Sequence, residues 1–160
     1  MPDLSQDSLP ATMGRGVAAG LAGTAVMTAF QHLVEMPLTG RKESYAPADL
    51  VMKLLPVKPK RGRDRRRLNY AAHFGVGVAW GVGHALIARR AGLRGQPAVA
   101  LAFGALYGGD VVGNTALGLD KPWEWSRQDL LIDVGDKLLL AETTGLVFDA
   151  LRGRGAAAGS

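Results

Sequence analysis

The sequence predicts an all-α protein, a membrane-embedded bundle of four transmembrane helices with glycine-rich packing and a short interfacial helix in its first loop. Two uncharged stretches of eighteen residues, 17–34 and 71–88, are long enough to cross a bilayer core, which takes about 20 apolar residues in a helix. A third apolar stretch, 97–119, is interrupted only by Asp110. A densely basic loop joins the first two, which is typical of the cytoplasmic side of a membrane protein.

The chain length and composition set the domain organisation. One hundred and sixty residues suit one domain, and the absence of cysteine excludes a disulfide framework, a thiolate metal site and a cysteine nucleophile. We expect a polar tail over 1–13, a single transmembrane domain over 14–151 and a tail over 152–160 that is disordered by composition. The expected spans are about 14–36, 70–89, 97–119 and 129–151, with a basic loop over 37–69.

The first loop carries the charge of the protein. Ten Lys or Arg against three acids give residues 41–67 a charge of +7, although the whole chain carries only +5. We expect a solvated topology anchor that contacts anionic lipid headgroups, and no binding of nucleic acid, because the charge lies in one loop and not on a folded face with reading side chains. The expected lipid contacts are Lys58, Lys60, Arg61, Arg63, Arg65, Arg66 and Arg67.

The distribution of Lys and Arg predicts how the chain crosses the membrane. Twelve basic residues fall in loops one and three, against six on the opposite side. This places the basic loop 41–67 in the cytoplasm and both termini outside. Within the loop, a short helix beginning at Pro47 is expected to lie in the membrane interface, and 57–67 is expected to be irregular. Trp123 and Trp125 are expected to be interface anchors.

The first span has a defined end, and the fourth span carries several charges. Pro37 is expected to end the first span. The fourth span, 129–151, is rich in Leu, Ile, Val and Phe but also carries five charged side chains between 133 and 149. Asp133 and Lys137 stand at i,i+4 and can neutralise each other, so insertion is plausible beside three other helices.

Glycine recurs at helical spacing in several of the expected spans. Small residues allow close approach of helices in lipid, where the hydrophobic effect does not drive helices together. The glycines expected to pack between helices are Gly16, Gly20, Gly77, Gly81, Gly104, Gly108, Gly109 and Gly113.

A set of short motifs resembles the YagU-like family of bacterial inner-membrane proteins. The glycine-rich first span ends in E-M-P-L at 35–38, a histidine opens the second span at His73, and G-L-D-K-P-W-E-W-S at 118–126 precedes a last helix with Glu142 near its middle. The resemblance covers most of the chain from Gly14 to Asp149, although the loop after the first span is shorter here. It implies a helical bundle in the bacterial inner membrane and carries over no catalytic residue.

Ionisable side chains within the spans are the candidates for function, because they are costly in hydrocarbon. At the predicted depths they form a possible ladder from one side to the other, with Asp110 near the midplane. The candidate partners of Asp110 are Asn114, Tyr107, His73 and His84. The possible proton or ion relay consists of His32, Glu35, His73, His84, Asp110, Asn114 and Glu142.

Three functions remain open at this level. The first is a structural or accessory membrane component whose polar residues hold helices together. The second is a small channel or carrier for protons or cations, which needs a homo-oligomer because four short helices enclose little room. The third is a lipid- or haem-handling subunit of a larger complex. No hydrolase, metalloprotease or P-loop motif occurs, so we expect no enzyme, no metal site and no cofactor.

Overall fold

The computed structural model describes residues 8–158, and the described residues contain helices and no strands. The all-α prediction is confirmed. The elements are α1 (Leu9–Phe30), the π-helical turn η1 (Gln31–Glu35), α2 (Met36–Thr39), α3 (Ala46–Leu54), α4 (Gly62–Ala91), α5 (Gly95–Ala116), the 3-10 turn η2 (Pro122–Glu124) and α6 (Arg127–Ala158).

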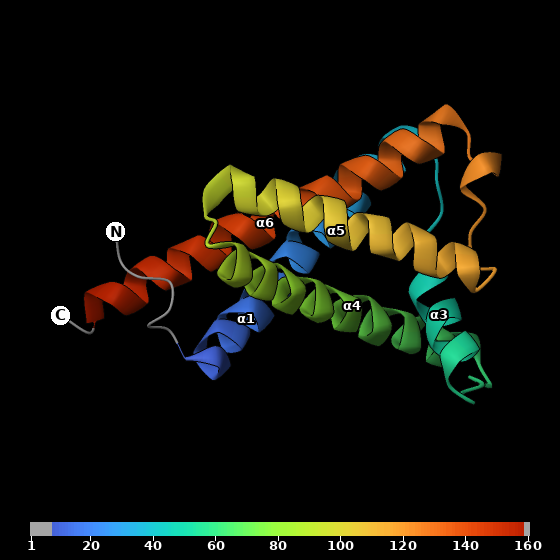
Figure 1. The fold of residues 1–160 in the computed structure, drawn as a ribbon. Coiled ribbons are helices and arrows are strands. Elements are labelled where there is room, and N and C mark those ends of the chain that lie inside the picture. The colour runs from blue at the N-terminus through green and yellow to red at the C-terminus, as the bar shows by residue number, and fades with distance from the viewer. Residues whose placement is uncertain (1–7, 159–160) are drawn as a thin grey trace.

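Four long helices run up and down in sequence order (Figure 1). The start of α1 and the end of α6 lie at one end of the molecule, and α3 with the loop between α5 and α6 lies at the other. Helix α1 packs against both α4 and α6, and α5 packs against the same two helices from another side. Helix α3 packs on α4. Loops one and three therefore share one end of the bundle.

The first span differs from the prediction at both ends. Ser8 caps α1, and its side chain accepts a hydrogen bond from the Ala11 amide, so 8–13 belongs to the helix and not to a polar tail. Residues 1–7 of that expected tail lie outside the described residues. Pro37 does not end the helix, because it stands in the first turn of α2, directly after the π turn, where a missing N–H is tolerated. The helical run ends at Gly40, which has a φ of 70°.

The basic loop is more helical than expected. Helix α3 forms over Ala46–Leu54 with Pro47 in its first turn, as predicted. The expectation that the chain is irregular as far as 67 is wrong, because α4 begins at Gly62 and carries the last four arginines of the loop in its first turns. The expected disordered tail is also wrong as far as Ala158, since α6 continues to that residue, and 159–160 lie outside the description.

Two of the helical runs are long and apolar enough to cross a membrane. They are Leu9–Thr39 and Gly62–Ala91, each of which contains an apolar window of 18 residues, with a mean hydropathy of 1.4 and 1.3. Helices α5 and α6 do not reach that level of apolarity, although both are long enough. The structure thus bears out a helical bundle with two such helices and leaves four crossings as a proposal.

The contact between α1 and α4 is made through glycine. A side-chain carbon on Gly16 would come within 2.8 Å of the carbonyl oxygen of Gly81, and one on Gly81 would come within 2.6 Å of the α-carbon of Gly20. Gly77 meets the Thr24 side chain in the same way. The G-x-x-x-G spacings at 16–20 and 77–81 therefore pack against each other, as the sequence predicts.

The glycines of α5 do not take part in such a contact. Within the described chain, a side-chain carbon on Gly104, Gly108, Gly109 or Gly113 would meet no atom within 4 Å. Their assignment to packing between helices of this chain is wrong, because α5 turns other residues, Ala98, Val99 and Ala102, towards α4 and α6. Close contacts that were not singled out occur at Gly23, which faces Thr144, and at Gly145, which faces Val99.

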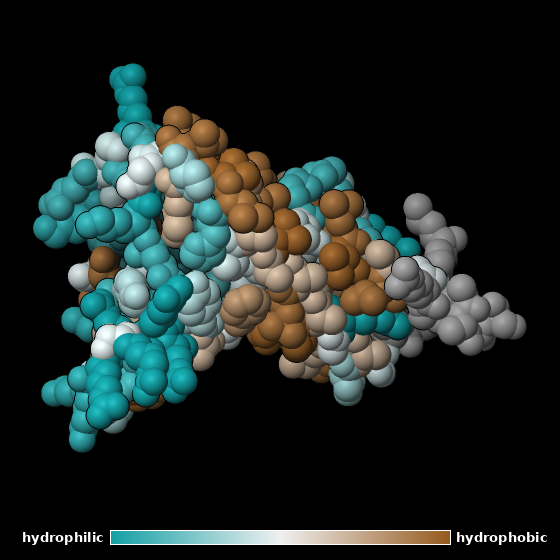
Figure 2. Space-filling view, turned by 180° about the vertical axis from the view of Figure 1, so that it is seen from behind, coloured by the Kyte–Doolittle hydropathy of each residue, from teal (hydrophilic) through white to brown (hydrophobic). Residues whose placement is uncertain are grey.

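The interior and the surface of the bundle are inverted relative to a water-soluble protein. Eight of the thirteen buried apolar side chains of the described residues are alanine. Large apolar side chains lie outside, with exposed fractions of 73% at Leu131, 68% at Val112 and 69% at Leu146. Figure 2 shows these residue types as a hydrophobic region across the middle of the molecule, next to a hydrophilic end formed by the basic loop.

Gly20→Ala and Gly108→Ala should have opposite effects on stability. A methyl group at position 20 would press on the backbone of Gly77 and Gly81, and overpacking of this kind costs ~1–3 kcal/mol. At position 108 nothing is near, so the higher helix propensity of alanine should stabilise α5 by up to ~1 kcal/mol. Unfolding in detergent measures both, and equal effects would contradict the packing described.

Candidate functional site

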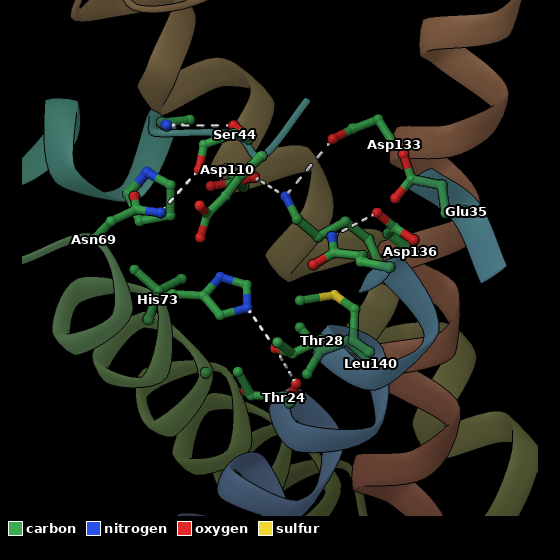
Figure 3. A pocket seen from close by; sticks show the side chains of 18 of the residues that line it. Thr24, Thr28, Glu35, Ser44, Asn69, His73, Asp110, Asp133, Asp136 and Leu140 are labelled. Atoms are coloured by element: carbon green, nitrogen blue, oxygen red, sulfur yellow. Dashed lines mark hydrogen bonds and ion pairs between the residues drawn. The ribbon is translucent and has the colours of Figure 1, made fainter. Parts of the chain in front are cut away.

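A cavity of about 210 Å³ lies at the end of the bundle that carries the basic loop. Helices α1, α4, α5 and α6 form its walls together with η1, the start of the basic loop and α3 (Figure 3). Its lining includes five of the seven predicted relay residues, namely His32, Glu35, His73, Asp110 and Asn114. The sequence therefore identified much of one site, although not its shape.

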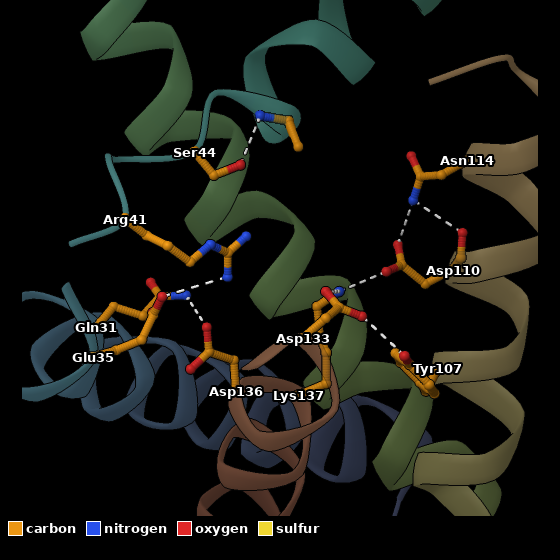
Figure 4. Close-up of polar contacts among 11 residues, drawn as sticks. Gln31, Glu35, Arg41, Ser44, Tyr107, Asp110, Asn114, Asp133, Asp136 and Lys137 are labelled. Carbon is orange, nitrogen blue, oxygen red and sulfur yellow. Dashed lines mark hydrogen bonds and ion pairs between the residues drawn. The ribbon is translucent and has the colours of Figure 1, made fainter. Parts of the chain in front are cut away.

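Two buried carboxylates meet at one wall of the cavity. Glu35 is 8% exposed and Asp136 is 7% exposed, and the two interact electrostatically. Gln31 donates a hydrogen bond of 2.6 Å to Oδ2 of Asp136, while Oδ1 of that side chain has no hydrogen-bond partner among the described residues. Arg41 approaches Glu35 at 3.5 Å from the loop (Figure 4). The π turn places Gln31 and Glu35 together on this side of the helix.

Lys137 joins α5 to α6. Its ammonium group lies 2.6 Å from Asp110 and 4.0 Å from Asp133. Asn114 donates to the second oxygen of Asp110 at 2.9 Å, and Tyr107 donates to Asp133 at 2.9 Å (Figure 4). The predicted i,i+4 pair is therefore present, but the shorter contact of Lys137 is to Asp110. Of the partners expected for Asp110, Asn114 is confirmed.

Hydrogen bonding fixes the tautomer of His73. The hydroxyl of Thr28 donates to the carbonyl oxygen of Thr24 at 2.7 Å, so its proton is engaged. Nε2 of His73 lies 3.0 Å from the same hydroxyl oxygen and must therefore donate to it. Nδ1 is then an acceptor, and Figure 3 shows this face of the ring turned towards the cavity.

The loop end of the cavity is tied to α4 by Asn69. This buried side chain accepts a hydrogen bond from the Ala48 amide at 3.2 Å and donates to the Ser44 carbonyl at 2.8 Å. His32 lies at the mouth, exposed, with its Nε2 3.2 Å from the Tyr70 hydroxyl. Asp120 reaches the lining from the loop after α5, where burial, and then Asp133 and Asp110, raise its pKa.

The predicted ladder across the membrane is not continuous within this chain. His84 and Glu142 do not line the cavity. His84 is 1% exposed and packs edge-on against Phe148, and Glu142 accepts a hydrogen bond from Gln96 at 2.8 Å. An apolar layer separates them from the cavity, because intervening positions on the helices bury large apolar side chains. This layer contains Met27, Trp80, Val99, Leu140 and Ala141, with Phe103 and Leu106 packed against it.

The donors in the cavity do not form a metal site. In residues 8–153, where side chains are described, no group of three His, Asp or Glu is arranged to hold a metal ion. His32 and His73 are each hydrogen-bonded through Nε2 to another side chain.

The residues expected at the membrane surface are exposed. Arg65 pairs with Asp49 at 2.8 Å and lies over the ring of Tyr45, so it ties α4 to α3. Trp123 is 72% exposed, whereas Trp125 lies partly buried in the cavity wall. The other basic side chains expected to contact lipid are exposed as well, namely Lys58, Lys60, Arg61, Arg63, Arg66 and Arg67.

Several residues of the site were not among the predicted relay, namely Gln31, Tyr107, Asp133, Asp136 and Lys137. Their spacing contains a signal. Asp133, Asp136, Lys137 and Leu140 recur at intervals of three or four and share one face of α6. Taken singly, each acid counts against membrane insertion of this helix. The face that these residues form together is visible only from their spacing.

Comparison with known proteins finds no relative of this chain. The chain matches no family model, no curated protein and no solved structure. The resemblance to the YagU-like family therefore rests on the quoted motifs alone.

Lys137 and Asp110 should be energetically coupled. Lys137→Met leaves Asp110 without its cation, and Asp110→Asn in the same chain removes the uncompensated charge. We therefore expect the double variant to be less destabilised than the sum of the single variants, with a coupling of about 1–3 kcal/mol. A double-mutant cycle of unfolding free energies in detergent measures this, and strictly additive effects would show that the pair is not formed.

Proposed function

We propose that the protein is an integral membrane protein whose four long helices all cross the bilayer, and that it acts as a structural or accessory component of the bacterial inner membrane. The observation that carries the proposal is the inverted distribution of side chains. Alanine supplies eight of the thirteen buried apolar side chains of the described residues, and many large aliphatic side chains lie outside. A water-soluble bundle would bury those aliphatic side chains, because each gains about 1.5–3 kcal/mol on leaving water.

The less apolar helices α5 and α6 fit the same proposal through their packing. Helices α5 and α6 each pack alongside helices of the two candidate spans, so they would lie at the same depth in the bilayer as those spans. Lys137 of α6 pairs with Asp110 of α5 between the two helices. Lipid-facing positions of α6 carry leucine instead, at Leu131, Leu138 and Leu146. A paired charge inside a bundle avoids most of the cost of a lone charge in hydrocarbon.

The accessory role follows from how the polar groups are used. Most of them are partners of one another across helix contacts, from Gln31 to Asp136 and from Tyr107 to Asp133. Such bonds fix the register of neighbouring helices in a membrane. Within the described residues, the apolar layer next to the cavity interrupts the series of polar side chains. Transport of ions would then need an assembly of several copies.

The orientation of the bundle can be tested with a matched pair of single cysteines. Gly62 and Gly153 are both exposed helical glycines with no neighbouring atom within 4 Å of an added side chain, and they lie towards opposite ends of the bundle. The wild type has no cysteine that would react. In intact cells a membrane-impermeant thiol reagent should label Gly153→Cys and spare Gly62→Cys. The reverse pattern would overturn the orientation, and labelling of neither after lysis would show that the reagent does not reach these sites.

A further inference from the structure

The cavity carries an excess of negative charge. Six carboxylates line it against three cationic side chains. Lys137 serves Asp110 and Asp133 together, and Arg41 contacts Glu35 at 3.5 Å from an exposed position. The deepest of the acids, Asp136, has no cationic partner within ion-pair distance in the described residues. A cation is therefore what the cavity lacks.

Buried polar atoms in the lining are left without partners. Oδ1 of Asp136 and Nε1 of Trp80 belong to side chains more than nine-tenths buried, and neither has a hydrogen-bond partner in the described residues. Such groups are costly unless something satisfies them. Nδ1 of His73 adds an acceptor on the same cavity, because its tautomer is fixed by Thr28. Oδ1 of Asp136 and Nδ1 of His73 are acceptors, which suit a ligand with several N–H donors, whereas Nε1 of Trp80 is itself a donor.

One part of the lining is apolar. Met27, Val76 and Leu140 line the cavity together with the ring of Trp80. A volume of about 210 Å³ holds roughly seven waters at ~30 Å³ each. A hydrated metal ion would find no preformed set of three donors here. A short alkyl chain with a charged nitrogen at one end would match both surfaces.

We propose that this cavity binds a primary ammonium group, with its N–H donors directed at the carboxylates of Asp136 and Glu35 and at Nδ1 of His73. The attached carbon atoms lie on the apolar wall. Two sources share this chemistry. One is a free small amine from the cytoplasm, and the other is the headgroup of phosphatidylethanolamine, whose phosphate would meet Arg41 and Lys42, two exposed side chains of the lining. Binding of a free amine does not depend on the proposed membrane role, whereas binding of the lipid headgroup rests on that role.

Thermal unfolding of the full-length protein in phosphatidylcholine nanodiscs tests the chemistry. At constant ionic strength and neutral pH, where a primary amine is protonated, butylammonium should raise the unfolding temperature in a saturable way. Tetramethylammonium has the charge but no N–H, and butyrate has the opposite charge, so neither should do so. Equal stabilisation by butylammonium and tetramethylammonium would reduce the effect to non-specific charge and overturn the proposal, and so would no response to butylammonium.

Variants on one helix locate the binding. Asp136→Asn should weaken the response to butylammonium at least tenfold. Glu142→Gln makes the same change of charge on the same helix but outside the cavity, and it should respond like the wild type. If Asp136→Asn does not assemble, Glu35→Gln gives the decision at the second proposed carboxylate ligand, whose ion-pair partner Arg41 is exposed. An unaltered affinity in the assembled variant, or an equal loss in Glu142→Gln, would overturn the site.

The lipid source is separated from the free amine by the choice of nanodisc. The trimethylated headgroup of phosphatidylcholine has no N–H, so it leaves the site open to butylammonium. If the natural ligand is the phosphatidylethanolamine headgroup, discs of that lipid should raise the unfolding temperature and abolish the response to added amine. A response that is the same in both discs assigns the site to free amines. Failure of membrane embedding would appear instead as release of the protein from membranes by alkaline carbonate, whatever the result of the amine titration.

Discussion

The close contact of α1 with α4 is the constraint on which the rest of the bundle depends. Gly16 and Gly20 meet Gly77 and Gly81 with no side chain between the two backbones. Because α1 lies this close to α4 and also packs on α6, the π turn and its polar residues face the cavity. A wider spacing would separate Gln31 from Asp136 and Thr28 from His73, whose side chains bridge at 2.6 and 3.0 Å. The geometry of the site is therefore set several turns away from it.

The same packing accounts for the position of the charges. Because the helices contact one another through alanine and glycine, there is space between them only where larger polar side chains lie. These polar side chains are gathered at the end that carries the basic loop. There the ion pair of Lys137 with Asp110 and the bond of Tyr107 to Asp133 hold α5 to α6. Towards the other end, Ala85, Ala88, Ala98 and Phe148 close the core. The cavity thus lies at one end of the bundle, and a packed core closes the other.

Periodicity and composition were enough to predict the helices and part of the site. The G-x-x-x-G pairs at 16–20 and 77–81 were readable because each lies in an uncharged helical run. The same reasoning was wrong for Gly104 and Gly108, since spacing along one helix does not tell which face has a neighbour. Pro37 predicts the end of the first span because proline breaks most helices, but the helix continues through the π turn before it, and such a turn leaves no mark in hydropathy. His73 and His84 were both expected in the relay at different depths, yet an apolar cluster lies between them, which only the packing of four helices shows.

The central claim is that the exposed leucines of α6 face lipid while Asp133 and Asp136 of the same helix face the cavity. Spin labels placed singly along α6 in reconstituted bilayers test it through their collisions with oxygen, which dissolves in lipid, and with a polar nickel complex, which stays in water. The account predicts high oxygen and low nickel contact at Leu138 and Leu146, and protection from oxygen at Leu140 and Thr144, which are buried. High nickel contact at Leu138 and Leu146 would place this helix in water and contradict a four-helix membrane bundle.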